Sequence, residues 1–180
     1  NSFDGGLPAG WSISSANSAK WRFDNPGSRV NYTGGAGGFA IADSYHYSSY
    51  LMDCSLQSAT FDLRAYSSVS LQFRHDFSPR GQIWKSAACY NWLGNPYACG
   101  YYTDEYNEKG AIDVRVGAGA WMNIVTLSSS SYSGLQALDV SSWAANQQNV
   151  SFRFRYFDAK NQIWWQVDDF ILAGGLTPII

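Results

Sequence analysis

The segment Val150-Ser151-Phe152-Arg153-Phe154-Arg155-Tyr156 decides the fold class, because apolar and polar residues alternate strictly along it. A period of two is the signature of a half-buried β-strand, since successive side chains point to opposite faces. The pattern predicts that the apolar set, from Val150 to Tyr156, faces a core and that both arginines face outward.

The same alternation recurs along the chain, whereas helical periodicity is almost absent. Turn-forming stretches such as Asn25-Pro26-Gly27 separate the runs. One helical turn is expected near Asp139–Ala145, with Asp139 or Ser141 as its cap. Many short strands between turns predict an all-β antiparallel sandwich or barrel. The other expected strands are Trp21–Phe23, Gly38–Asp43, Ser55–Asp62, Val69–Phe77, Ala111–Val116, Asn123–Leu127 and Ile163–Leu172.

Length and charge limit the class of protein. The chain has 180 residues and a formal net charge of −2. It therefore suits one compact domain, which we place at residues 1–172, with 173–180 as a terminal tail or the start of a linker. The near balance of charge argues against nucleic-acid binding, which needs a basic patch. No apolar run approaches the roughly 20 residues of a membrane-spanning helix.

The N-terminus and the composition suggest a secreted protein. The chain opens with Asn1-Ser2-Phe3-Asp4, so no signal peptide is visible, and the missing initiator methionine suggests a mature fragment or an excised domain. Lysine is scarce, while serine, glycine, tyrosine and tryptophan are plentiful. That balance is typical of extracellular β-proteins.

Two of the three cysteines bracket a turn-forming segment. Cys89 and Cys99 flank residues 90–98, in which Gly94 and Asn95-Pro96 favour a reversal of the chain. The spacing predicts a Cys89–Cys99 disulfide, which stabilises by about 2–3 kcal/mol in the chain-entropy model. The alternative is two unpaired, buried small side chains. Cys54 is left over and is expected to be a buried thiol.

Five segments form a series that covers nearly the whole chain: FDGGLPAGW at 3–11, GFAIADS at 38–44, MDCSLQSATFDL at 52–63, LQFRHDF at 71–77 and WWQVDDFIL at 164–172. Together they resemble MAM-like modules, also called choice-of-anchor or cleaved-adhesin jelly rolls, of bacterial secreted proteases and adhesins. The resemblance implies a jelly-roll sandwich and a parent secreted protein. The chain departs from the pattern at Cys54, at Ala59 and in an aromatic excursion over 78–110.

Acidic residues recur at positions that this resemblance would bring together. It implies that the first and last strands run side by side, which would place Asp4 close to Asp168 or Asp169 and build a structural calcium site there. Carboxylates that converge without basic partners repel one another, and Ca²⁺ binds six to eight oxygens, including carbonyls such as those of 33–38. Alternatively, these side chains cap turns or accept backbone N–H groups. The expected metal ligands are Asp4, Asp43, Asp53, Asp168 and Asp169.

An aromatic cluster fills residues 84–106, interleaved with glycine, asparagine and aspartate. Tyrosine and tryptophan combine a flat apolar face with a polar edge, which suits sugar rings and protein surfaces. The cluster predicts a recognition platform; alternatively, the rings cover an open side of the sandwich. The expected ligand-binding residues are Trp84, Tyr90, Trp92, Tyr97, Tyr101 and Tyr102.

Arginines also occupy outward-facing positions on two of the predicted strands. If those strands are neighbours, Arg74, Arg153 and Arg155 form a ladder with Asp76 that suits an anionic sugar or a carboxylate. The alternative is a solvated face with weak ion pairs.

Catalytic signatures are missing from the sequence. It contains no H-E-x-x-H, G-x-S-x-G or phosphate-binding loop motif, and His75 alternates in phase with the core. Asp104, Glu105 and Glu108 are the best candidates for a pair of glycosidase carboxylates. We therefore expect a non-catalytic extracellular module that binds polysaccharide or glycoprotein. The alternatives are an adhesin or protein-interaction domain and, third, a small jelly-roll glycoside hydrolase or lyase.

Overall fold

The computed structural model describes residues 2–79, 83–103 and 108–176, of which 83–89 and 97–103 are described as backbone. No helix within these residues is long and apolar enough to cross a membrane. Apart from one helical turn, α1 (Ser141–Ala144), the elements are strands. They are β1 (Ser12–Ser15), β2 (Ala40–Asp43), β3 (Met52–Gln57), β4 (Tyr66–Phe77), β5 (Ile83–Tyr90), β6 (Pro96–Thr103), β7 (Lys109–Val116), β8 (Met122–Leu127), β9 (Tyr132–Asp139), β10 (Val150–Ala159) and β11 (Trp164–Leu176).

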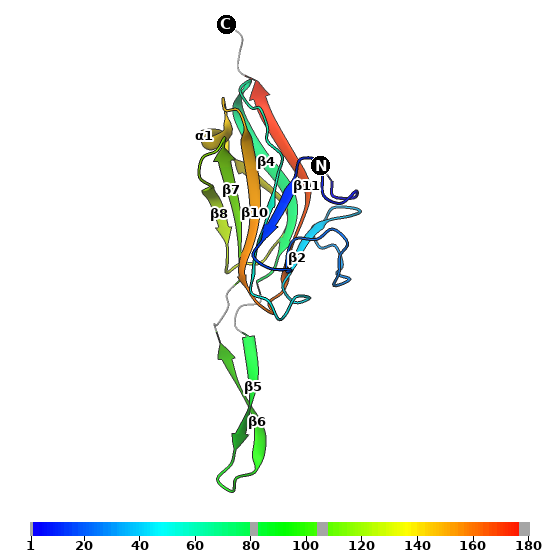
Figure 1. The fold of residues 1–180 in the computed structure, drawn as a ribbon, viewed down its shortest axis with the longest axis vertical. Coiled ribbons are helices and arrows are strands. Elements are labelled where there is room, and N and C mark those ends of the chain that lie inside the picture. The colour runs from blue at the N-terminus through cyan, green and yellow to red at the C-terminus, as the bar shows by residue number, and fades with distance from the viewer. Residues whose placement is uncertain (1, 80–82, 104–107, 177–180) are drawn as a thin grey trace.

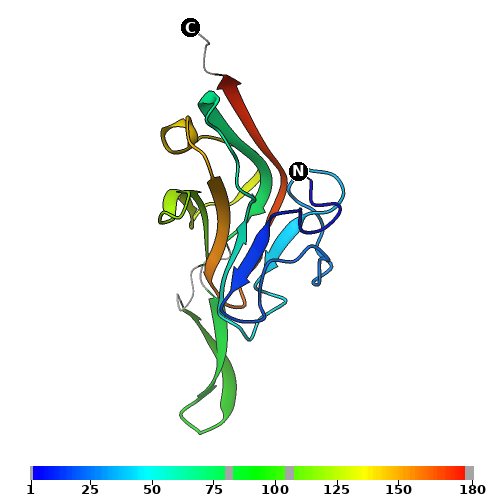
Figure 2. The ribbon, with the colours of Figure 1, turned by 45° about the horizontal axis from the view of Figure 1, so that its top comes forward.

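Two antiparallel sheets stack as a sandwich (Figures 1 and 2). One has the strand order β1-β3-β10-β7-β8, and the other has the order β2-β11-β4-β9. The expected all-β jelly-roll sandwich is therefore confirmed. Of the expected strands, Trp21–Phe23 is reduced to a single bridge between Arg22 and Ile41, whereas β1 and β9 were not expected.

Aromatic side chains from the two inner faces fill the core. Phe154 of β10 meets Phe73 of β4 edge to face, with ring centroids 5.0 Å apart, and Trp165 of β11 at 5.8 Å. The alternating apolar set of β10 is fully buried, as its sequence predicts. Each such side chain stabilises the fold by about 1.5–3 kcal/mol.

Residues 83–103 form a separate β-hairpin rather than an irregular loop. β5 and β6 pair only with each other and extend away from the sandwich (Figure 1). We call this hairpin the arm. Its turn is ordered by Asn91, whose side-chain oxygen accepts the N–H groups of Leu93 and Asn95 at 2.9 and 3.0 Å. Gly94 takes a positive φ of 78°, which glycine adopts without strain.

β11 is longer than its sequence predicts. It pairs with β2 over 164–167 and with β4 from Trp165 to Leu176. Residues 173–176, expected in the terminal tail, therefore belong to the strand. The register with β4 shifts between Asp168 and Ile171, where Asp169 has a positive φ of 51°. This irregularity turns two neighbouring carboxylates toward the loop at 33–38.

Candidate functional site

An acidic site forms where β11 meets the glycine-rich loop 33–38. A Cβ atom on Gly35 would collide with the carboxylate of Asp168 and would lie 3.3 Å from Asp169 Oδ2. Three residues further along the same loop, the Gly38 N–H donates to Asp4 Oδ1 at 2.6 Å. The loop therefore holds carboxylates from both ends of the chain, which was the central expectation for Asp4.

The carboxylate of Asp168 is buried and only partly satisfied. Its Oδ1 accepts the Asp169 N–H at 2.8 Å, whereas its Oδ2 has no hydrogen-bond partner among the described residues. Burial and the nearby Asp169 carboxylate raise the pKa of Asp168, while the Asp169 N–H, the Phe3 N–H and the Asn31 side chain lower it. An unpartnered buried carboxylate oxygen is costly. It is the feature of this site that fits a bound cation.

The other two expected ligands lie elsewhere, each against an arginine. Asp43 accepts Arg29 Nε at 2.8 Å, and Asp53 accepts Arg155 Nε and Nη2 at 2.8 and 2.7 Å. The expectation that all five aspartates meet was therefore wrong. A sequence does not reveal that an aspartate has an arginine partner on another strand.

The strand pairing that brings the two ends of the chain together also differs from the expectation. β1 pairs with β3 in the five-stranded sheet, so the first and last strands do not run side by side. Instead, the turn before β1 brings Asp4 to the loop. Within the described ranges, no three His, Cys, Asp or Glu side chains group closely enough to hold a metal by themselves. A cation here would need carbonyl or water oxygens as well, which Ca²⁺ accepts.

The tip of the arm exposes apolar side chains. Trp92 is 91% exposed, Tyr90 67% and Leu93 62%. The alternative that these rings cover the sandwich as core was therefore wrong for the tip. The side chains of Trp84, Tyr97, Tyr101 and Tyr102 lie outside the described residues.

The arm also bears on the expected disulfide. Backbone register pairs Cys89 with Tyr97 and Cys99 with Ala87, so the two cysteines are not directly opposite each other in the ladder. The cysteine side chains themselves lie outside the described residues, and the disulfide stays a prediction. Cys54, by contrast, is buried as a free thiol, as expected.

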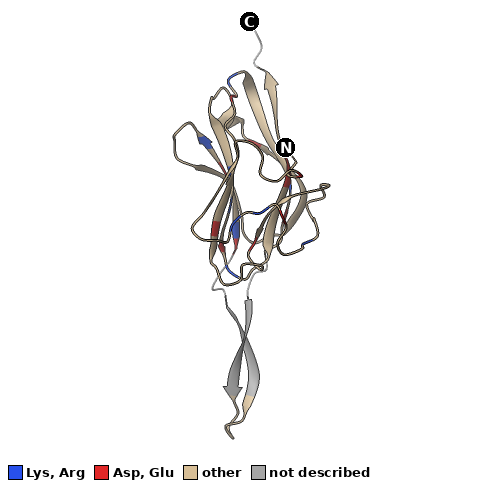
Figure 3. Ribbon diagram, turned by 45° about the vertical axis from the view of Figure 1, so that its right-hand side comes forward, with Lys and Arg blue, Asp and Glu red and all other residues tan. Residues whose placement is uncertain are grey.

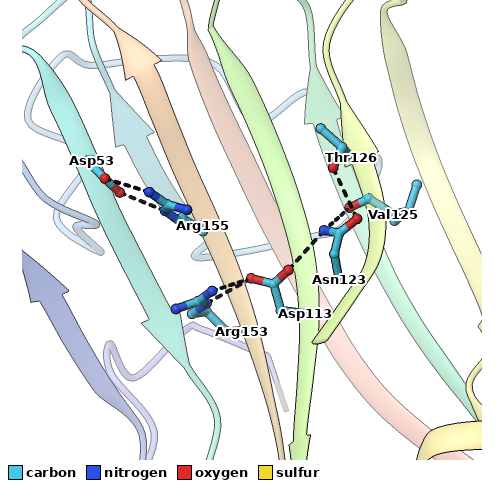
Figure 4. Close-up of polar contacts among 7 residues, drawn as sticks. All are labelled: Asp53, Asp113, Asn123, Val125, Thr126, Arg153 and Arg155. Carbon is cyan, nitrogen blue, oxygen red and sulfur yellow. Dashed lines mark hydrogen bonds and ion pairs between the residues drawn. The ribbon is translucent and has the colours of Figure 1, made fainter. Parts of the chain in front are cut away.

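The outer face of the five-stranded sheet carries a network of charged and amide side chains (Figure 4). Arg153 donates twice to Asp113 Oδ2, at 2.8 and 2.7 Å, and Asn123 donates to Asp113 Oδ1 at 2.9 Å. Arg155 pairs with Asp53 on the neighbouring strand. We call this surface the polar face; Figure 3 shows that short basic and acidic segments are interspersed over the sandwich.

This network corrects the expected arginine ladder. Arg74 lies on β4, in the other sheet, and its Nε is 3.3 Å from Asp169. It therefore belongs to the acidic site, and Asp76 takes no part in the network around Arg153. Arg153 and Arg155 were placed correctly on an outward face, but Asp113, Asn123 and Trp121 were missed, because their proximity depends on the pairing of β10, β7 and β8.

Glu108, an expected glycosidase candidate, is an interior residue. It is 1% exposed, accepts the hydroxyl of Tyr156, and accepts the Ile163 N–H at 3.3 Å. A catalytic carboxylate must reach the scissile bond, so this position is unsuited to hydrolysis. Asp104 and Glu105 lie outside the described residues.

Comparison with known proteins places the fold. The sequence matches no protein-family model and no curated protein. A cleaved adhesin domain of Lys-gingipain from Porphyromonas gingivalis is 14% identical, with a TM-score of 0.59 over 97% of this chain and 96% of that chain. A second cleaved adhesin domain of Lys-gingipain is 13% identical, with a TM-score of 0.54 over 96% and 97%. TmCBM61, solved with β-1,4-galactotriose, is 14% identical, with a TM-score of 0.53 over 97% and 94%. At these identities the likeness establishes a jelly-roll fold shared with adhesin domains and a carbohydrate-binding module.

Proposed function

We propose that this chain is a non-catalytic binding module of an extracellular protein, and that it holds polysaccharide or glycoprotein through the tip of its arm. The observation that carries the proposal is the exposure of Trp92, Tyr90 and Leu93 at the end of a hairpin that leaves the sandwich. Exposed, clustered apolar side chains mark interaction sites.

The tip suits recognition because it is rigid as well as apolar. The Asn91 side chain fixes the turn, and Gly94 N–H donates to the Asn91 carbonyl at 2.9 Å. An ordered turn loses little backbone entropy on binding, and an aromatic ring on it offers a flat face to a sugar. The fold neighbours named above, one of them solved with an oligosaccharide, support the same class of function.

A second function has its own support. The exposed aliphatic side chain of Leu93 beside Trp92 suits a protein pocket better than a sugar. An adhesin or protein-interaction domain of a secreted protease or surface protein is therefore the second candidate, and the cleaved adhesin neighbours favour it.

We also propose that the acidic site binds a structural Ca²⁺. Asp4, Asp168 and Asp169 would hold the ion, together with carbonyl oxygens of loop 33–38. The unpartnered Oδ2 of Asp168 supports this proposal, and carboxylate-rich oxygen sites suit calcium. Arg74 already pairs with Asp169, so the ion would neutralise the remaining carboxylate charge and tie the N-terminal turn to β11.

The binding proposal is tested with Trp92→Ala. Titration of the wild-type chain against a panel of polysaccharides and glycoproteins should identify a ligand. The variant should then bind at least about tenfold more weakly, since one ring on a ligand contributes about 1–3 kcal/mol. Leu135→Ala, which truncates an exposed side chain on β9, is the matched control. Equal affinities for all three proteins would exclude the arm tip as the site.

A further inference from the structure

Among the described residues, the polar face contains one cation, Arg115, that no carboxylate pairs with. Arg153, Arg155 and Lys109 pair with Asp113, Asp53 and Asp158, at 2.7 to 2.8 Å. Arg115, on β7, makes no ion pair with any described residue. The chain as a whole carries a net charge of −2, so a surplus positive charge on this face is a local feature.

Among the described residues, two buried polar atoms at this position have no hydrogen-bond partner. Arg115 Nε and Ser151 Oγ each lack a hydrogen bond among the described residues. Ser151 of β10 is directly opposite Arg115 of β7 in the antiparallel register, so both side chains lie on the same face. Because unpaired buried polar groups are costly, an acceptor oxygen that reached both would stabilise this spot.

Trp121 holds the guanidinium groups in place. Its ring centroid is 4.4 Å from Arg115 Cζ and 4.6 Å from Arg153 Cζ. Contact with an aromatic face fixes the orientation of the planar guanidinium and reduces the entropy that it loses when it binds an anion. The preceding residues, Gly117–Ala120, are exposed, so a ligand can approach from that side.

We propose that Arg115, with Ser151 and Trp121, forms a second binding site on the polar face that takes the carboxylate of an acidic saccharide. A guanidinium matches a carboxylate by two parallel hydrogen bonds. The surroundings suit a sugar, because the Asn123 amide and the Trp121 ring supply hydrogen-bonding and apolar contacts of the kind that line saccharide sites. This inference rests on the proposed saccharide function, and it adds the charge of the ligand and a site separate from the arm.

The test uses oligomers of galacturonate, glucuronate and mannuronate, each beside the neutral hexose oligomer of the same length and linkage. Titration calorimetry on the whole chain should give at least about tenfold tighter binding of one acidic oligomer, because a charge-assisted pair is worth about that much. Arg115→Gln should abolish the preference. Arg64→Gln, which removes an exposed arginine that pairs with Asp62, should retain it.

Every other result counts against the site. If no acidic oligomer is preferred, or if Arg115→Gln keeps the preference, the site holds ordered water only and the inference is overturned. If polyglutamate binds as tightly as the uronates and loses its binding in Arg115→Gln, the occupant is an acidic peptide and the saccharide assignment is wrong. Trp92→Ala separates the two proposals. If Trp92→Ala loses binding and Arg115→Gln does not, only the arm site is supported. If Arg115→Gln loses the acidic preference and Trp92→Ala binds normally, only the site on the polar face is supported.

Discussion

At the scale of single residues, His75 links stability to acid. It is fully buried on the inner face of β4, accepts Trp165 Nε1 on its Nδ1 at 3.3 Å, and stacks on Tyr132 with ring centroids 4.6 Å apart. Burial lowers the pKa of His75 to about 4, partly offset by Gln136. The side chain is therefore neutral in the folded protein at neutral pH, in agreement with its core-facing phase in the sequence.

We expect the free energy of unfolding to fall as the pH drops from about 6.5 to about 4. In that window the unfolded chain binds a proton on His75 and the folded chain does not, so acid favours unfolding by roughly 3 kcal/mol in total. Above pH 6.5 both states are neutral and this contribution is constant. Urea titrations at stepped pH values measure the effect.

The control for this prediction is His75→Phe, which keeps an aromatic ring and cannot titrate. Between pH 6.5 and 4, the free energy of unfolding of this variant should depend less on pH than that of the wild type. The variant also leaves Trp165 Nε1 without its acceptor, but that loss of stability is the same at every pH. Parallel curves for the two proteins would show that groups other than His75 cause the acid sensitivity.

At the scale of elements, the sequence predicted strands where one face is buried. β10, β4 and β7 show a strict alternation because each packs one face on the core. β9 was missed because it lies at the edge of its sheet, where serine, glycine and glutamine replace a clear apolar phase. The strands of the arm were not among the expected strands, since a hairpin outside the core needs no burial pattern.

Some residues of the candidate sites could be predicted from the sequence and others could not. Asp4, Asp168 and Asp169 were found because a resemblance of the terminal motifs placed them together. Asp43 and Asp53 were misassigned, and Arg115 was not singled out, because ion pairing depends on which strands are neighbours. That information is in the strand order, which no local pattern specifies.

The loop 33–38 is the element on which the calcium proposal depends. With Ca²⁺ at about a hundredfold excess over its dissociation constant, the ion should stabilise the fold by about 2.7 kcal/mol, so a chelator should lower the thermal midpoint by about 5–10 °C. Added Ca²⁺ should restore it. Gly37→Ala should blunt this response, because Gly37 has a positive φ of 81° and its new Cβ would collide with Asp4 Oδ1.

Gly5→Ala is the matched control for that variant. A Cβ at Gly5 meets no atom within 4 Å, so this substitution should leave the calcium response intact. If the chelator does not change the thermal midpoint of the wild type, the calcium proposal is wrong. If Gly37→Ala and Gly5→Ala respond equally to the chelator, Asp4 is not a ligand of the ion.

At the scale of the whole molecule, the arm is set apart from the folded sandwich. The sandwich core draws its buried residues from both sheets, and β5 and β6 pair with neither sheet. If the arm is an independent extension, replacing residues 80–107 by a short Gly-Ser linker should leave the sandwich folded. The thermal midpoint should change by no more than about 3 °C, because less than about 1 kcal/mol of sandwich stability would be lost.

The same deletion should abolish binding of any ligand that Trp92→Ala weakens, while binding that depends on Arg115 persists, because the polar face lies on the sandwich. Calorimetry with the preferred ligands and circular dichroism on the shortened chain measure both outcomes. Loss of the folded sandwich would show that the arm contributes to the core. A folded sandwich that keeps full affinity for the Trp92-dependent ligand would show that the arm is not where recognition takes place.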